Sequence, residues 1–287
     1  SESTLIVFME SSRPCRYIDL FAGCGGISLG LHNAGWRGIF AVEKSRMAFE
    51  TLRHNLIDKG EHFDWPPWLP VCEHDIVDVL GSYRHELRKL KGNVDLVSGG
   101  LPCQGFSLAG RRDERDKRNS LVDSYVEFVK LVRPHALFFE NVVGFTIAFK
   151  KEGSGGEAYS NLVIRRLQEL GYRVKGELMD FSDFGVPQRR RRYILIGLEE
   201  GDPGSFFDSM FKARKNYLAS KGIGEKTTLG EAISDLERRH GEVDSVESTS
   251  FKNGLYGKPE SAYQKLIRNG YEKDLPELER AMSNMEE

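Results

Sequence analysis

The chain has 287 residues, of which 39% are hydrophobic and 29% charged, and its formal net charge is −2 at pH 7. This length and apolar content suit one large α/β domain with an appendage, or two small domains, and argue against disorder throughout. The small net charge removes overall positive charge as an argument for nucleic-acid binding, so any such partner must be argued from local sites.

Residues 1–14 are interpreted as a leader or tag-like segment and are set apart from the fold. From Arg16 onward, short apolar runs alternate with helical patterns. Strands are expected near residues 16–21, 38–43, 71–75, 94–98, 135–141, 172–179 and 193–198. Helices are expected near residues 27–34, 45–57, 82–90, 121–132 and 157–170.

Several predicted strands are almost continuously apolar, for example residues 94–98 and 136–139. Such runs are typical of a parallel sheet that is buried on both faces. The pattern predicts a doubly wound α/β fold with helices on both faces of the sheet. Ligands of such sheets bind beyond the carboxyl ends of the strands, so functional residues are expected just after each apolar run.

The periodicity weakens after about residue 200. Residues 227–238 read as a capped helix, 256–259 as a turn and 262–269 as a short helix. We therefore expect a catalytic or binding domain over residues 15–200 and a separate, incomplete region over 201–287.

The four cysteines, at positions 15, 24, 72 and 103, form no C-x-x-C pair and have no histidine at metal-ligand spacing. This argues against both a zinc site and a disulfide framework. There is also no apolar run of about 18 residues and no signal-peptide pattern. An intracellular protein without a metal site is therefore expected.

The first predicted strand runs into the sequence DLFAGCGG, residues 19–26. Its glycines permit a tight turn and the close approach of a ligand. The register of a G-x-G-x-x-G phosphate motif is not met, because Ser28 occupies one position and Gly30 falls inside the helix. The pattern favours a cofactor lying across the turn, with a simple structural turn as the alternative.

Acidic residues end the next two predicted strands. Glu43 follows the glycine turn by about 20 residues, the spacing at which a carboxylate accepts hydrogen bonds from ribose hydroxyls. Asp75 is placed to reach an adenine amino group, with Ile76 against the ring. The alternative is that both carboxylates cap helices. Their occurrence on successive strands favours a nucleoside cofactor.

Cys103 lies in the sequence GGLPCQGFS, residues 99–107, at the exit of the fourth predicted strand. A thiol at this place is expected to be exposed, although a lone cysteine is more often a small buried hydrophobic residue. A nucleophilic thiolate needs positive potential nearby, which the basic residues at 111–118 offer. The alternative for that basic run is a solvated surface.

The fifth predicted strand ends in the sequence Glu140-Asn141-Val142, after the apolar run 136–139. Partial desolvation there raises the pKa of a carboxyl group and suits it to share a proton, whereas a plain strand-end contact is the alternative. The run QRRRR at 188–192 indicates phosphate contact. Arg190 and Arg192 share one side of the last strand if that strand has already begun.

Taken in order, these motifs closely resemble the cytosine-C5 DNA methyltransferase family over roughly residues 16–198. The ordered set, rather than any one motif, carries the resemblance. It implies a Rossmann-like, S-adenosylmethionine-dependent methyltransferase fold with a mostly parallel, seven-stranded sheet in which 193–198 is antiparallel. It also implies a bacterial cytoplasmic or eukaryotic nuclear location.

The resemblance implies S-adenosyl-L-methionine as the cofactor and no metal. The residues implied to line its pocket are Phe21, Ala22, Gly23, Gly25, Gly26, Glu43, Asp75, Ile76, Pro102 and Leu121. Cys103 is implied as the nucleophile that adds to carbon 6 of a flipped-out cytosine. Glu140 is implied to bind the cytosine edge, with Arg190 and Arg192 facing the base and its phosphate.

The family continues into a target-recognition domain and two further motifs that this sequence does not show, and residues 201–287 resemble the approach to that domain. The implied partners are double-stranded DNA and a polypeptide supplying the remainder. One alternative is a tRNA cytosine methyltransferase, which Gly105-Phe106-Ser107 disfavours because that branch usually has Pro-Phe-Thr. The other, a catalytically silent subunit, is disfavoured because Cys103 and Glu140 are intact.

Overall fold

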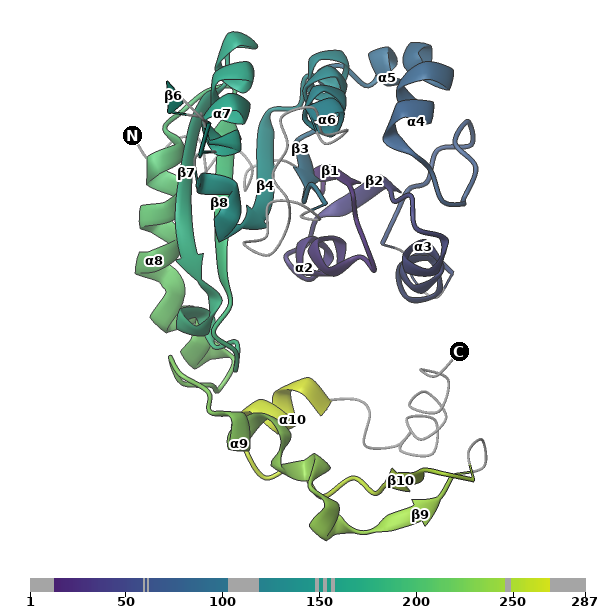
Figure 1. Ribbon diagram of the computed structural model, residues 1–287, viewed down its shortest axis with the longest axis vertical. Helices are drawn as coiled ribbons and strands as arrows, with labels where there is room; N and C mark the ends of the chain where they lie inside the picture. Colours follow the sequence, from purple (N-terminus) through teal and green to yellow (C-terminus); the bar gives the residue numbers. More distant parts are fainter. Residues whose placement is uncertain are drawn as a thin grey trace. The chain divides into compact units, whose positions relative to one another are not determined.

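The computed structural model describes residues 13–58, 60, 62–102, 119–147, 150–151, 154–155, 158–245 and 249–268. The chain divides into two compact units. The first unit comprises residues 1–179 and 191–208, and the second comprises 180–190 and 209–287. Figure 1 follows the elements along the chain.

Six strands form the central sheet of the described part of the chain. In spatial order they are β2 (Arg37–Val42), β1 (Arg16–Leu20), β3 (Leu96–Gly99), β4 (Ala136–Val142), β8 (Arg191–Leu198) and β7 (Arg173–Asp180). Strand β1 pairs in parallel with β2 and β3, β3 pairs in parallel with β4, and β8 runs antiparallel to β4. The predicted α/β fold, its mostly parallel sheet and the antiparallel strand at 193–198 are confirmed.

The strand predicted near residues 71–75 is wrong, so the sheet has six strands rather than seven among the described residues. Residues 71–75 are irregular and join the end of β2 through a bond from His74 N to Glu43 O, 2.8 Å long. Three prolines (Pro66, Pro67 and Pro70) precede this segment. Proline donates no backbone hydrogen bond and restricts the preceding residue, so the local chain does not build a ladder.

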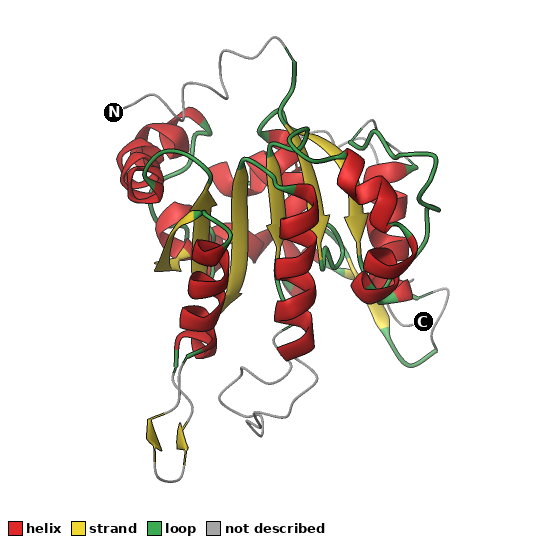
Figure 2. Ribbon diagram, turned by 90° about the horizontal axis from the view of Figure 1, so that it is seen from above, coloured by secondary structure: helices red, strands yellow, loops and turns green. Residues whose placement is uncertain are grey.

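Helices lie on both faces of the sheet (Figure 2). The helices of the first unit are α2 (Gly26–Asn33), α3 (Arg46–Leu52), α4 (Ile76–Ser82), α5 (Arg84–Lys89), α6 (Asn119–Val132) and α7 (Tyr159–Glu169). A π-helical turn (Arg53–Ile57) extends α3, and a 3-10 turn (Val143–Thr146) follows β4. A short hairpin consists of β5 (Lys150–Lys151) and β6 (Ser154–Gly155).

The apolar core of the first unit lies on the two faces of this sheet. Phe40 of β2 packs toward α6, where its ring centroid lies 6.4 Å from that of Phe128. The next residue, Ala41, belongs to a second cluster with Phe49 and Leu52 of α3. Alternating side chains of one strand thus enter the two cores, as the pleat of a strand requires.

The second unit contains short elements. After α8 (Pro203–Ser220), which crosses the boundary between the units, come α9 (Leu229–Ile233), the hairpin β9 (Glu242–Asp244) and β10 (Lys252–Gly254), and α10 (Ala262–Arg268). Short 3-10 turns occupy Phe181–Phe184, Ser234–Leu236 and Arg238–His240. The predicted helix cap is confirmed, because Thr228 and Glu231 form a reciprocal capping box before α9.

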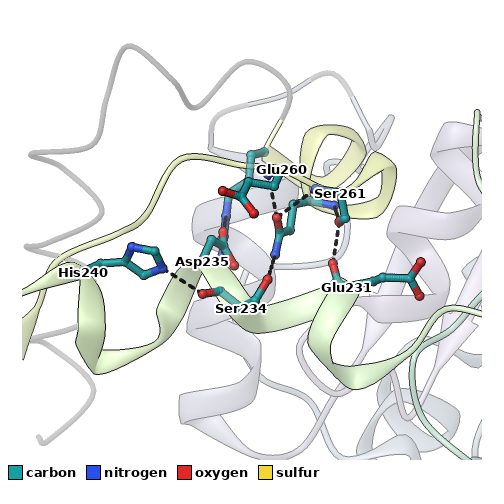
Figure 3. Close-up of polar contacts among 8 residues, drawn as sticks. Glu231, Ser234, Asp235, His240, Glu260 and Ser261 are labelled. Atoms are coloured by element: carbon teal, nitrogen blue, oxygen red, sulfur yellow. Dashed lines mark hydrogen bonds and ion pairs between the residues drawn. The ribbon is translucent and has the colours of Figure 1, made fainter.

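Polar side chains hold α9 and α10 together (Figure 3). Gln264 is fully buried and donates to Ser234 Oγ over 2.9 Å, while its carbonyl oxygen accepts from the backbone N–H groups of Glu260 and Ser261. The carboxylate of Asp235, with 1% of the side chain exposed, pairs with Arg268 at 2.8 Å. The interior of this region is therefore organised by hydrogen bonds and charge.

Candidate functional site

The turn after β1 has an unusual backbone. Phe21 has a φ of 56°, which is uncommon for a residue with a side chain, and Gly23 and Gly25 also have positive φ values. The turn closes through a bond from Gly25 N to Ala22 O, 2.9 Å long. Strain of this kind costs about 1–3 kcal/mol and is concentrated at functional sites.

Space is open at one side of this turn and filled at the other. A side chain at Gly25 would meet Leu56 at 2.6 Å, whereas a Cβ at Gly23 or Gly26 would meet nothing within 4 Å. Gly25 therefore permits close packing against the chain after α3. Gly23 and Gly26 leave room for a ligand beside the beginning of α2.

Glu43 ties the glycine turn to the beginning of α3. Its Oε2 accepts from Gly23 N over 2.8 Å, and its Oε1 accepts from Ser45 N over 2.7 Å. Ser45, rather than Glu43, caps α3. Each carboxylate oxygen has two acceptor sites, so both oxygens of Glu43 can still accept a bond from a hydroxyl group.

Asp75 caps α4 and is also paired with a cation. Its Oδ1 accepts from Val77 N over 3.0 Å, and its Oδ2 lies 2.6 Å from Lys44 Nζ. The hydrogen bond from Lys44 lowers the pKa of Asp75 below its usual value. Ile76, which follows, is only 2% exposed and packs into the core. The helix-capping alternative thus describes Asp75 but not Glu43.

The chain after β3 passes close to the end of β4. A Cβ at Gly100 would lie 3.3 Å from Glu140 Oε2, so glycine permits this approach. Asn141, which is buried, donates from Nδ2 to Leu101 O over 3.3 Å and holds the exit of β3 in place. Pro102 is exposed. Cys103 and the basic residues at 111–118 lie outside the described residues.

Glu140 and Arg192 form an ion pair at the rim of the sheet. Arg192 Nε lies 2.8 Å from Glu140 Oε1, and the two side chains are 21% and 27% exposed. The antiparallel register explains the contact, since Arg192 lies opposite Val142, two residues beyond Glu140. The structure therefore brings together two of the four residues expected to act on the base.

Arg190 is placed differently. Strand β8 begins at Arg191, so the condition under which Arg190 and Arg192 would share one side of a strand is not met. Arg190 is exposed and belongs to the second unit, whereas Arg192 belongs to the first. Sequence alternation alone therefore does not place Arg190 beside Glu140.

Two apolar residues expected at the cofactor pocket border the main core. Phe21, in the strained turn, and Leu121, in α6, are both partly buried and pack against that core. Ala22, between Phe21 and Gly23, is 9% exposed and belongs to the cluster beneath α3. Partial burial leaves part of the Phe21 and Leu121 side chains accessible to a ligand.

Asp19 was not among the expected site residues. It is fully buried in β1, where Ser28 Oγ donates to one carboxylate oxygen over 2.6 Å and Ser98 Oγ donates to the other over 2.8 Å. Burial raises the pKa of Asp19 to about 6. A charged residue inside an apolar strand was the signal that could have identified it. Asp19 links β1, β3 and α2 beneath the glycine turn.

Within the described ranges, no three His, Cys, Asp or Glu side chains are grouped so that they could hold a metal ion. No helix in the same part of the chain is long and apolar enough to cross a membrane.

The C-5 cytosine-specific DNA methylase family matches residues 15–285. The chain is 36% identical over 257 residues to the type II methyltransferase M.XorII of Xanthomonas oryzae pv. oryzae, covering 88% of this chain and 53% of that protein. It is 34% identical over 254 residues to M.DdeI of Desulfomicrobium norvegicum, covering 88% and 54%. The chain thus spans about half the length of these relatives.

Another relative differs in coverage. M.AquIA of Picosynechococcus sp. is 32% identical over 234 residues, which are 77% of this chain and 88% of that protein. Among solved structures, a putative DNA modification methyltransferase encoded in an E. coli prophage is 27% identical, with a TM-score of 0.47 and coverage of 64% of this chain and 46% of that one. The extent of the family match shows that this chain belongs to the C-5 cytosine-specific DNA methylase family.

Proposed function

We propose that this chain is the catalytic part of an enzyme that methylates carbon 5 of cytosine in double-stranded DNA. The family match over residues 15–285 carries the proposal. The relatives include a DNA (cytosine-5)-methyltransferase from Paracentrotus lividus, 30% identical over 282 residues. Residues 15–200 form the catalytic domain in this proposal, and 201–287 lead toward target recognition.

S-adenosyl-L-methionine is the cofactor implied by this family. When bound, it supplies an electrophilic methyl group on a sulfonium sulfur. The open space at Gly23 and Gly26, together with the free acceptor sites of Glu43 and Asp75, fits a nucleoside ligand with hydroxyl and amino donors. In the proposed pocket Glu43 holds the ribose, Asp75 the adenine amino group, and Phe21, Ala22, Gly25, Ile76, Pro102 and Leu121 form the walls.

Cys103 is proposed as the nucleophile. Carbon 5 of cytosine is a weak nucleophile, and addition of a thiolate to carbon 6 shifts electron density onto carbon 5. Transfer of the methyl group to carbon 5 would break the bond to the sulfonium sulfur and leave S-adenosylhomocysteine. A base then removes the proton from carbon 5 and the thiolate leaves carbon 6, which restores the ring. Carbon 6 is inaccessible in stacked DNA, so the base must be flipped out at a cost of a few kcal/mol.

Glu140 is proposed to bind the cytosine ring at N3 and the amino group. The ion pair from Arg192 to Oε1 fixes the direction of the carboxylate and leaves Oε2, which faces Gly100, for the base. Asn141 keeps the exit of β3 beside it, and two residues further along that exit comes Cys103. In this proposal Arg192 orients Glu140, and the exposed Arg190 contacts a phosphate.

A trapping experiment tests the nucleophile. The complete protein, with S-adenosylmethionine and DNA carrying 5-fluorocytosine, is expected to form a covalent adduct, because fluorine at carbon 5 blocks the final proton loss. Cys103→Ala should abolish the adduct and Cys72→Ala should retain it. An adduct that persists in Cys103→Ala contradicts the assignment, and methyl transfer to tRNA but not to DNA contradicts the proposed substrate.

A second variant tests Glu140. Glu140→Gln keeps the shape of the side chain but cannot share a proton, so turnover is expected to fall by about 10²–10⁴-fold while binding of DNA is retained. Glu177→Gln, on β7, serves as the control. The measurements are tritium transfer and fluorescence of 2-aminopurine at the target base. Near-normal turnover in Glu140→Gln would exclude the role.

We also propose that further polypeptide, as part of the same gene product or as a second subunit, packs on the second unit. Asp235 and Gln264 are buried there, whereas large apolar side chains are exposed. These are Leu229, Ile233, Leu236, Phe251, Leu266 and Ile267. Our proposal is that these side chains contribute to one apolar surface, and such contiguous surfaces mark sites of interaction with another chain or segment. The first relatives, of which the chain spans about half, contain enough additional sequence to cover it.

Complementation tests this partner. Residues 1–287 alone are expected to transfer little tritium and to bind DNA weakly, with strong salt dependence, because phosphate contacts carry little sequence information. Adding the polypeptide that corresponds to the rest of the relatives should restore sequence-specific methylation. Normal methylation by residues 1–287 without any addition would overturn the proposal.

A further inference from the structure

The side chain of Lys44 extends between Glu43 and Asp75, the two residues proposed to bind the cofactor through their carboxylates. Lys44 follows Glu43 directly at the end of β2, and its ammonium lies 2.6 Å from Asp75 Oδ2 at the beginning of α4. Its four-carbon stem therefore extends from the residue beside Glu43 to the carboxylate of Asp75. No other side chain described at this site connects the two positions.

The two carboxylates are held in different ways. Both oxygens of Glu43 accept backbone N–H groups, from Gly23 and Ser45, so the backbone alone orients it. Asp75 has one backbone donor, Val77 N, for Oδ1, and its Oδ2 is directed by Lys44. Only the Asp75 carboxylate depends on a side-chain cation for its orientation.

Building on the proposed cofactor site, we propose that Lys44 is a positioning residue that sets specificity for a purine with an amino group at position 6. It holds Asp75 Oδ2 in place as an acceptor for that amino group. A carboxylate oxygen has two acceptor sites, so Oδ2 can accept both the ammonium and the purine amine.

The specificity follows from the hydrogen-bonding character of the two partners. An ionised carboxylate is an acceptor only, so it matches an exocyclic amine. A purine with an oxygen at position 6 presents a second acceptor, and both groups lose hydration without forming a bond. If Asp75 is free to turn away, this penalty decreases, and so does the preference for the amine.

Binding measurements with two ligands test the role of Lys44 in the complete protein. S-adenosylhomocysteine carries the amine, and S-inosylhomocysteine carries oxygen in its place. Lys44→Met is expected to weaken S-adenosylhomocysteine binding by about 2- to 5-fold, the range of an exposed ion pair. The same variant should not weaken the binding of S-inosylhomocysteine, because the penalty against its oxygen decreases. Isothermal titration calorimetry gives both dissociation constants and therefore their ratio.

Two control variants separate positioning from a general effect of charge. Lys44→Arg retains a cation of similar reach and should restore the ratio of the two dissociation constants. Arg46→Met removes a cation two residues away, which pairs at 2.8 Å with Glu50 on the surface of α3. That variant should leave both dissociation constants unchanged.

The outcomes distinguish this inference from the proposed function. Normal binding of S-adenosylhomocysteine with an unchanged ratio in Lys44→Met overturns the role of Lys44 alone. Tighter binding of S-adenosylhomocysteine in Lys44→Met also overturns it, because the ammonium of Lys44 would then compete with the adenine amine for Asp75. No binding of S-adenosylhomocysteine by the protein without substitutions overturns the cofactor site and the role of Lys44 together.

Discussion

The two units use opposite kinds of interior. In the first, large rings such as Phe40, Phe128 and Phe139 are fully buried around the sheet. In the second, between α9 and α10, the buried side chains include Asp235 and Gln264. Burying a large apolar side chain contributes about 1.5–3 kcal/mol, whereas a typical hydrogen bond contributes a net 0.5–1.5 kcal/mol. Apolar packing thus stabilises the first unit, while polar contacts mainly set geometry in the second.

Asp19 in the first unit and Asp235 in the second are both almost completely buried, and the two are held differently. Asp19 accepts hydrogen bonds from the neutral hydroxyls of Ser28 and Ser98. Asp235 is paired with the cation of Arg268, whose guanidinium also lies 5.1 Å from the ring of Tyr256. Asp235 therefore depends on one charged side-chain partner, whereas Asp19 depends on two neutral donors.

The largest difference in the free energy of unfolding is expected between alanine variants of two phenylalanines. Phe40→Ala, in the first unit, should lower the free energy of unfolding by about 3–5 kcal/mol, because the side chain is fully buried and leaves a cavity. Phe251→Ala, in the second unit, should change it by less than about 0.5 kcal/mol, because Phe251 is 65% exposed. Denaturant unfolding measures both. Similar losses would contradict the contrast between the units.

A somewhat smaller loss of stability is expected when the cation of Arg268 is removed from the second unit. Arg268→Met leaves the buried Asp235 carboxylate without its charged partner and should destabilise α9 and α10 by about 3 kcal/mol. Hydrogen exchange should accelerate there but not in β1 to β4. Arg238→Met is the control, since Arg238 is 87% exposed in its pair with Glu242. Equal exchange in the two variants would show that Asp235 does not need Arg268.

The smallest effect concerns pH and Asp19. Its folded-state pKa of about 6 lies above the ordinary 3.8, so its contribution to stability is fully present below about pH 4 and is lost as pH rises through 6. Between pH 4 and 7, the free energy of unfolding should therefore fall by about 2–3 kcal/mol relative to Asp19→Asn. Exposed Asp58→Asn is the control. If the free energy of unfolding varied with pH in the same way in the Asp19→Asn variant and in the protein without it, the raised pKa of Asp19 would be contradicted.

Much of the first unit could be predicted from the sequence, because strand and helix periodicities are local. The apolar run 136–139 became part of the buried strand β4, and Glu43 directly follows the end of β2 as expected. Glu140 lies within β4, two residues before its end. The expected strand at 71–75 did not form, because apolar and β-branched composition does not reveal whether a neighbouring edge is available for pairing. Proline-rich sequence before it was the local warning.

The contacts of the site could not be predicted from sequence order. The pairs Glu140–Arg192 and Lys44–Asp75 join residues 52 and 31 positions apart, respectively. Asp19 likewise meets Ser98 across β1 and β3. Sequence by itself determined which residue types end each strand. Only the tertiary structure decided which of them meet, because strand register and helix packing bring distant side chains within hydrogen-bond distance, and hydrogen bonds act only at that range.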